Sequence, residues 1–289
     1  MATFEKISEH IWIMHAEHGT DRPILAAIAG EKRTLLMDAG NSPAHAKLFH
    51  EELIRQGVRL PDLLVLTHWH WDHSFGLPTW NVPVVAHAKT ALALAKLSEE
   101  SWSRETLDRL AREQVINEHT VAHITEEYGE QLDITIIRPD VVFEDRLQFD
   151  LGGVTCEIRH VGGDHTEDSC ILYVNEDRVL FVGDSLGPSV YGGPRTYTVE
   201  SFLGLLETTF SYDTGLIVES HGAPLDKEAF RKEIEPWEQL ARLVQRHGHA
   251  RETIAAEMCS YLQATTLPAE FAAALEWFLT GLGHSNRTE

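Results

Sequence analysis

The chain has 289 residues, of which 43% are apolar and 24% charged, a composition typical of a globular protein with a full-sized core. Its 24 Lys and Arg residues are outnumbered by 45 Asp and Glu residues, which gives a formal net charge of −21. Because this charge repels phosphate backbones and anionic membranes, we expect a small-molecule partner and neither a nucleic acid nor a membrane.

The three cysteines, Cys156, Cys170 and Cys259, are widely spaced and form no CxxC pair. This usage suits a reducing compartment. The first twenty residues lack a basic segment followed by an apolar one, and no apolar run approaches the roughly 20 residues of a membrane helix. We therefore expect a cytoplasmic protein.

The first 87 residues alternate short apolar segments with turns. Their spacing predicts, in chain order, a hairpin over 24–30 and 33–40, a helix over 44–58, and strands over 63–67 and 82–87. Residues 88–131 then predict a helical insertion, with Ser103 as an N-cap and Leu107 and Leu110 on one face.

Strand patterns return in the second half of the chain. They cover residues 154–161, 170–183 with a turn at 175–177, and 215–220, before a helical extension from about 228 to 289. Mixed strands and helices without a clear boundary predict a single layered α/β domain over residues 1–289.

Residues able to bind a metal follow four of the predicted strands. His68, His70, Asp72 and His73 occur within six positions after the strand that ends at Thr67. The other three strand ends are followed by His165, Asp184 and His221. Since strand ends are held rigidly at one edge of a sheet, these side chains predict a preorganised site.

The spacing predicts two metal ions. His68 and His70 point to the same side of an extended segment, whereas Asp72 and His73 can face a second ion. Imidazole suits zinc, and a carboxylate can bridge two ions. Adding the later residues completes one site from His68, His70 and His165 and another from Asp72, His73 and His221, with Asp184 as the bridge.

The sequence resembles the metallo-β-lactamase-fold metallo-hydrolases. Their HxHxDH marker is similar to residues 68–73, and VGGDHTEDS, VGDS and ESHG resemble the segments that carry their later ligands. MDAG at 37–40 resembles their early strand end; its Asp38 either caps a turn or orients a ligand. The resemblance implies a four-layer αβ/βα sandwich, with the helical insertion (about 88–131) and the C-terminal extension (about 228–289) outside it.

The resemblance also implies an enzyme. The expected reaction is hydrolysis of a small-molecule ester, thioester, lactone or related bond by a metal-bridging hydroxide, with Asp72 as a catalytic residue. The expected cofactors are two divalent ions, Zn²⁺ first, with Mn²⁺ or Fe²⁺ as alternatives. Other functions stay open: a mononuclear iron persulfide dioxygenase, a phosphodiesterase of the same superfamily, and a metal-binding protein without catalysis.

Two branches of this family differ from the sequence at positions in or near the predicted site. Related periplasmic β-lactamases carry Cys where this chain has Asp184, and lactonases usually carry Tyr where it has Gly187. Tyr191 and Tyr197, in the loop that follows, are candidate substrate-binding residues.

The predicted insertion is the expected specificity element, as a lid or as the arm of a homodimer. Within it, His119 and His123 are one helical turn apart with no carboxylate in a matching position. Their surroundings predict a solvent-facing side of a helix.

Overall fold

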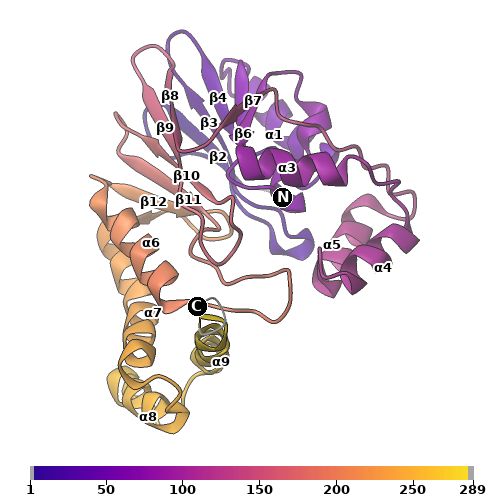
Figure 1. Cartoon of the computed structure of the whole chain (residues 1–289). Helices are drawn as coiled ribbons and strands as arrows, with labels where there is room; N and C mark the ends of the chain where they lie inside the picture. The colour runs from indigo at the N-terminus through magenta and orange to yellow at the C-terminus, as the bar shows by residue number, and fades with distance from the viewer. Residues whose placement is uncertain (1–2, 286–289) are drawn as a thin grey trace.

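Two β-sheets face each other and helices cover the outer face of each (Figure 1). The computed structural model describes residues 3–285. The strands of the first sheet, in spatial order, are β1 (Phe4–Lys6), β2 (Ile11–Met14), β3 (Leu25–Ala29), β4 (Thr34–Met37), β5 (Leu63–Val65), β6 (Val84–His87) and β7 (Val141–Phe143). Those of the second are β13 (Leu225–Asp226), β12 (Leu216–Glu219), β11 (Val179–Gly183), β10 (Cys170–Val174), β9 (Thr155–His160) and β8 (Arg146–Asp150).

The helices form the outer layers and the additions to them. Those assigned to the first half are α1 (Pro43–Arg55), the short α2 (Trp71–Ser74), α3 (Ala88–Leu97), α4 (Arg104–Arg112) and α5 (Glu118–Tyr128), with 3₁₀ turns η1 (His18–Thr20) and η2 (Leu77–Thr79). In the second half they are α6 (Val199–Ser211), α7 (Lys227–His247), α8 (Arg251–Leu262) and α9 (Ala269–Ser285). The predicted αβ/βα sandwich with its two helical additions is confirmed.

Three apolar clusters hold the layers together. Side chains such as Ile13, Val65 and Phe181 fill the space between the two sheets. Phe49 of α1 packs in the cluster outside the first sheet, and Phe230 of α7 in the cluster outside the second. Each sheet is therefore buried on both faces, which explains why most of its strands read as continuous apolar runs.

Most predicted elements are confirmed by the backbone. The hairpin is β3–β4, and α1 begins after Ser42, whose hydroxyl accepts a hydrogen bond from the His45 amide. Ser103 caps α4 as predicted, because its hydroxyl accepts from the amide of Thr106 at 3.1 Å. The elements that were not assigned from the sequence include strands β1, β2, β7, β8 and β13 and helix α6.

The C-terminal extension packs on the second sheet and reaches back toward the loop that precedes α6. The Tyr197 amide donates to the carbonyl oxygen of Trp277 in α9 at 3.1 Å. One turn further along α9, Gly281 lies so close to this loop that a Cβ would stand 2.0 Å from the Tyr197 carbonyl oxygen. Among residues 3–285, no helix is long and apolar enough to cross a membrane.

We expect Gly281→Ala to lower the free energy of unfolding by about 2 kcal/mol, because the added methyl group must push α9 away from Tyr197. Gly283→Ala is the matched control, since nothing lies within 4 Å of its Cβ position. That variant should be neutral or stabilising by up to about 1 kcal/mol through helix propensity. Thermal and urea unfolding measure both, and equal effects would contradict the close packing.

Candidate metal centre

The predicted ligands converge where the strands of both sheets end. The marker segment follows β5 in the first sheet, and the remaining ligands follow β9, β11 and β12 in the second. Their ligand atoms form two groups, within each of which the atoms lie no more than 4.8 Å apart. The groups are His68, His70 and His165, and Asp72, His73, Asp184 and His221. The structure thus brings all seven predicted ligands together.

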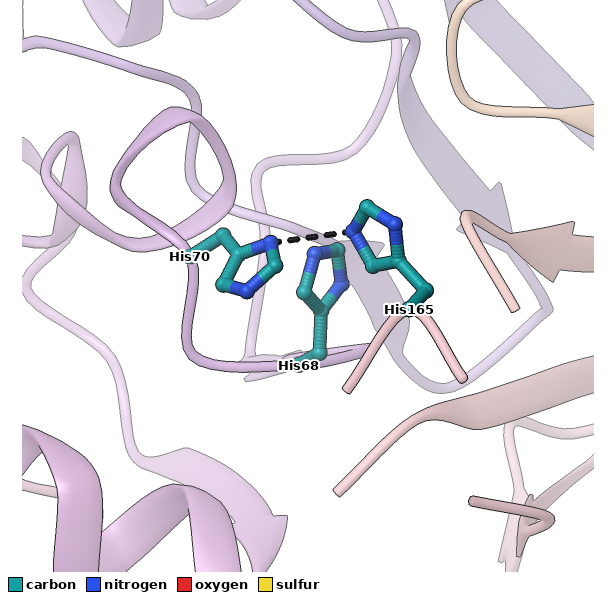
Figure 2. A group of neighbouring side chains, drawn as sticks. All are labelled: His68, His70 and His165. Carbon is teal, nitrogen blue, oxygen red and sulfur yellow. Dashed lines mark hydrogen bonds between the residues drawn. The ribbon is translucent and has the colours of Figure 1, made fainter. Parts of the chain in front are cut away.

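Three imidazoles form the first group, and their rings converge as Figure 2 shows. His165 Nε2 approaches His70 Nδ1 to 2.9 Å. His68 Nε2 is buried and has no hydrogen-bond partner within the described part of the chain. An unpaired buried nitrogen is costly, and it is satisfied if it binds a cation. This donor set therefore fits a metal such as zinc.

Asp184 lies between the two groups. Its Oδ2 is 3.4 Å from His73 Nε2 and 3.4 Å from His221 Nε2 in the second group. The same oxygen is 3.5 Å from His165 Nε2 and 3.9 Å from His68 Nε2 in the first. A single carboxylate oxygen near ligands of both groups occupies the position that a bridging ligand requires.

The first group is electrically neutral. Burial lowers the pKa of the His68, His70 and His165 imidazoles, well below the ordinary value for the first two, and the neighbouring imidazoles add to the effect. All three are therefore uncharged at neutral pH, which is the form that binds a metal.

The second group carries charge. Burial by itself would lower the pKa of His73 and His221, but the carboxylates of Asp72 and Asp184 outweigh it and raise both pKa values well above the ordinary one. Burial likewise opposes ionisation of the two carboxyl groups, yet the imidazoles hold their pKa values well below the usual range. The two carboxylates therefore hold a proton on each imidazole, and a metal ion bound here would take the place of those protons.

Asp38 orients one of the ligands. It is fully buried at the end of β4, with a left-handed φ of 61°. Its Oδ2 lies 2.8 Å from His73 Nδ1, and its Oδ1 accepts from the Thr67 amide at 2.8 Å. Because Nδ1 is engaged by the carboxylate, Nε2 is left to face the second group. Of the two roles open for Asp38 in the sequence, the geometry supports the orienting one.

Asp168 ties two ligand-bearing segments together, and sequence reasoning missed it. Its Oδ2 accepts from the Trp69 amide at 2.9 Å and from the Thr90 hydroxyl at 2.7 Å, and its Oδ1 accepts from the Thr166 hydroxyl at 2.7 Å. Trp69 stands between two ligands of the first group, and Thr166 follows the third. The available signal was its place in the VGGDHTEDS segment.

A cavity of about 370 Å³ opens over both groups. Tyr191 lines it, with its ring centroid 4.6 Å from that of His70 and its hydroxyl 2.9 Å from Thr120 Oγ1 of α5. Tyr197 does not line it: this residue is 5% exposed, packs against Phe278, and donates its hydroxyl to the Leu186 carbonyl oxygen. Its place in the core does not support the predicted substrate contact.

The insertion forms one wall of the same cavity. His119 and His123 of α5 line it, and His119 is exposed, as the sequence predicts. Their periodicity shows that they share a face, but it does not show what that face covers. Neither belongs to the two ligand groups.

Comparison with curated proteins gives partial matches. A human acyl-coenzyme A thioesterase is 29% identical over 133 residues, which are 46% of this chain and 44% of that protein. An atrochrysone carboxyl ACP thioesterase of Pseudocercospora fijiensis is 22% identical over 227 residues, 78% of this chain and 54% of that protein. The chain therefore spans about half the length of these relatives.

Solved structures share the fold. A metallo-β-lactamase from Pontibacter korlensis superimposes with a TM-score of 0.56 at 21% identity, covering 81% of this chain and 98% of that one. A stereoselective inverting sec-alkylsulfatase from Pseudomonas sp. gives a TM-score of 0.59 at 15% identity, covering 98% of this chain and 49% of that one.

The family model of the metallo-beta-lactamase superfamily matches residues 24–221, a span that contains both ligand groups. With its sandwich fold and its clustered HxHxDH residues, the chain belongs to the metallo-β-lactamase superfamily.

Proposed function

We propose that the protein is a hydrolase that requires two divalent metal ions and cleaves a thioester, or a related ester or lactone bond, in a small molecule. The observation that carries this proposal is the pair of ligand groups with one oxygen of Asp184 near both. Two relatives with thioesterase names support the choice of bond.

The chain supplies a complete set of ligands for this chemistry. His68, His70 and His165 would hold one ion, Asp72, His73 and His221 the other, and Asp184 would contact both. Nitrogen ligands with two carboxylates suit Zn²⁺, with Mn²⁺ and Fe²⁺ as alternatives. When bound, Zn²⁺ supplies a water nucleophile at neutral pH and polarises the carbonyl group under attack.

Other side chains of the cavity position the substrate and move its protons. The Asp72 carboxylate lines the cavity, and the neighbouring imidazoles keep it ionised, so it can accept the proton that passes to the leaving group. Burial raises the pKa of the Tyr191 phenol, so this hydroxyl stays protonated and serves as a hydrogen-bond donor to the substrate. A cytoplasmic location and a homodimer stay predictions from the sequence.

Metal content tests the proposal directly. Protein purified without added metal or a nickel column should contain about two zinc ions per chain by plasma mass spectrometry. His70→Ala should reduce this to about one, whereas His119→Ala, on the same cavity but outside both groups, should keep two. Chelation should abolish hydrolysis and added zinc should restore it.

A different metal content would change the function assigned to the protein. One iron per chain, with oxygen consumption on a persulfide, would replace the hydrolase with the dioxygenase. Protein that binds no metal under any loading condition would contradict the proposed function and favour a binding protein.

Asp72→Ala should reduce kcat by at least about 100-fold, because it removes both a ligand and a carboxylate of the cavity that can accept a proton. Circular dichroism should show an unchanged fold. Asp145→Asn, at an exposed position outside the cavity, is the control for the loss of a carboxylate charge. Near-normal turnover by Asp72→Ala on a thioester, ester and lactone panel would refute the assigned role.

Asp38→Asn and Asp168→Asn should each weaken metal affinity by about 10- to 100-fold while leaving the ligands themselves intact. Asn keeps the shape but loses the charge that holds His73 in one case and the Trp69 segment in the other. Competition with a chromogenic chelator measures the affinity. Values equal to those of the parent protein would show that neither carboxylate positions the ligands.

A further inference from the structure

The cavity wall that contains no metal-ligating residue is built from two segments. One is α5, in the insertion, and the other is residues 190–195 of the loop between β11 and α6. Asn117 Nδ2 donates to the Val190 carbonyl oxygen at 3.1 Å, and the Thr120 and Tyr191 hydroxyls are 2.9 Å apart. These bonds fix the loop against the helix, so the residues that the two segments present have a defined arrangement.

Arg195 stands on this loop at the exposed side of the cavity. Its guanidinium carbon lies 5.5 Å from the ring centroid of Trp277 in α9, which packs against the arginine without neutralising it. Within residues 3–285, no carboxylate is close enough to Arg195 to form an ion pair. Arg195 therefore places a guanidinium beside the cavity of the two ligand groups, with no carboxylate of the described residues to neutralise it.

Two imidazoles extend the same wall. His119 and His123 line the cavity from successive turns of α5. His123 Nδ1 is 3.6 Å from Asp21 Oδ2, whereas His119 has no carboxylate within ion-pair distance among the described residues. Imidazole N–H groups and a guanidinium are donors that suit carboxylate and phosphate oxygens.

The carboxylates that line the cavity do not neutralise the positive charge of Arg195 in this wall. Asp72 and Asp184 belong to the metal-ligand group, where imidazoles surround them. Asp21 lies 3.6 Å from His123 and 3.9 Å from His221. The carboxylates that line the cavity are therefore paired with imidazoles. The guanidinium of Arg195, on the loop, has no carboxylate partner among the described residues.

We propose that this wall binds an anionic group of the substrate, remote from the bond that is cleaved, with Arg195 as the residue that determines specificity for it. The inference rests on the proposed hydrolase function and narrows its substrate to a molecule with a carboxylate or a phosphate. The same hydrogen-bond donors would bind a carboxylate or a phosphate. The two groups differ in position, because the charge lies on the acyl side of the thioester in one case and on the thiol side in the other.

Three thioesters test the proposal and separate the two sources. Glutaryl and pentanoyl thioesters of N-acetylcysteamine have equal chain length and differ in one carboxylate on the acyl side. Pentanoyl-coenzyme A and pentanoyl-N-acetylcysteamine differ on the thiol side, where the coenzyme adds the rest of the pantetheine arm and a nucleotide that carries the phosphates. The parent protein should prefer one charged member by at least tenfold in kcat/KM. Arg195→Ala should lower that ratio at least tenfold, and Arg195→Lys should lower it less.

Arg112→Ala is the matched control, because it removes the same charge from an exposed arginine of α4 outside the cavity. The Arg112→Ala variant should have the same ratio of kcat/KM values as the parent protein. A parent protein without preference in either pair, or an Arg195→Ala variant that keeps the preference, would overturn the inference.

Binding measurements test this inference independently of the proposed hydrolase function. If none of these thioesters and none of the esters and lactones of the panel is cleaved, the hydrolase proposal fails, and calorimetric titration of the metal-loaded protein with glutarate, pentanoate and inorganic phosphate decides the inference alone. Glutarate or phosphate should bind more tightly than pentanoate, and Arg195→Ala should reduce this advantage at least fivefold. An advantage that is absent, or equal in the parent and the variant, would overturn it.

Discussion

The arrangement of the candidate metal centre depends on two buried carboxylates, one beside a strand of each sheet, that hold the segment 67–73. Asp38, at the end of a strand of the first sheet, accepts hydrogen bonds at both ends of this segment, from the Thr67 amide and from His73. Asp168, just before a strand of the second sheet, accepts from the Trp69 amide in its middle. The cost of burying these charges is offset by charge-assisted hydrogen bonds. As a result, the segment that carries four ligands is fixed relative to both sheets.

The other ligands acquire their positions from the same scaffold. His165, Asp184 and His221 follow strands of one sheet, and the register of that sheet sets the spacing between them. The second sheet thus contributes three ligands and Asp168, while the first contributes the marker segment and Asp38. A site assembled from both sheets requires the whole sandwich, which agrees with a family match over residues 24–221.

The sequence was sufficient for the ligands because their positions follow from local rules. Each ligand stands at or just after a strand end, and strand ends can be located from apolar runs and turn residues. The same rules located most strands and the two helical additions. They failed at β8, whose RLQFD pattern is only partly apolar. They also failed at Asp168, which is part of no strand pattern and whose hydrogen bonds to Trp69 and Thr90 join residues far apart in the sequence.

The cavity wall that carries Arg195 could not be predicted from those rules, because it forms where the two helical additions meet. α5 belongs to the insertion and α9 to the C-terminal extension, and the 184–198 loop lies between them. Helical periodicity places His119 and His123 on one face, but only packing decides that this face borders the cavity. Tyr197 illustrates the converse, since a loop tyrosine near the centre is withdrawn into the core by α9. The metal centre is therefore determined by strand ends inside the family match, whereas Arg195 depends on a helix outside it. Changes in the additions can alter the lining of the cavity without disturbing the two groups of candidate ligands.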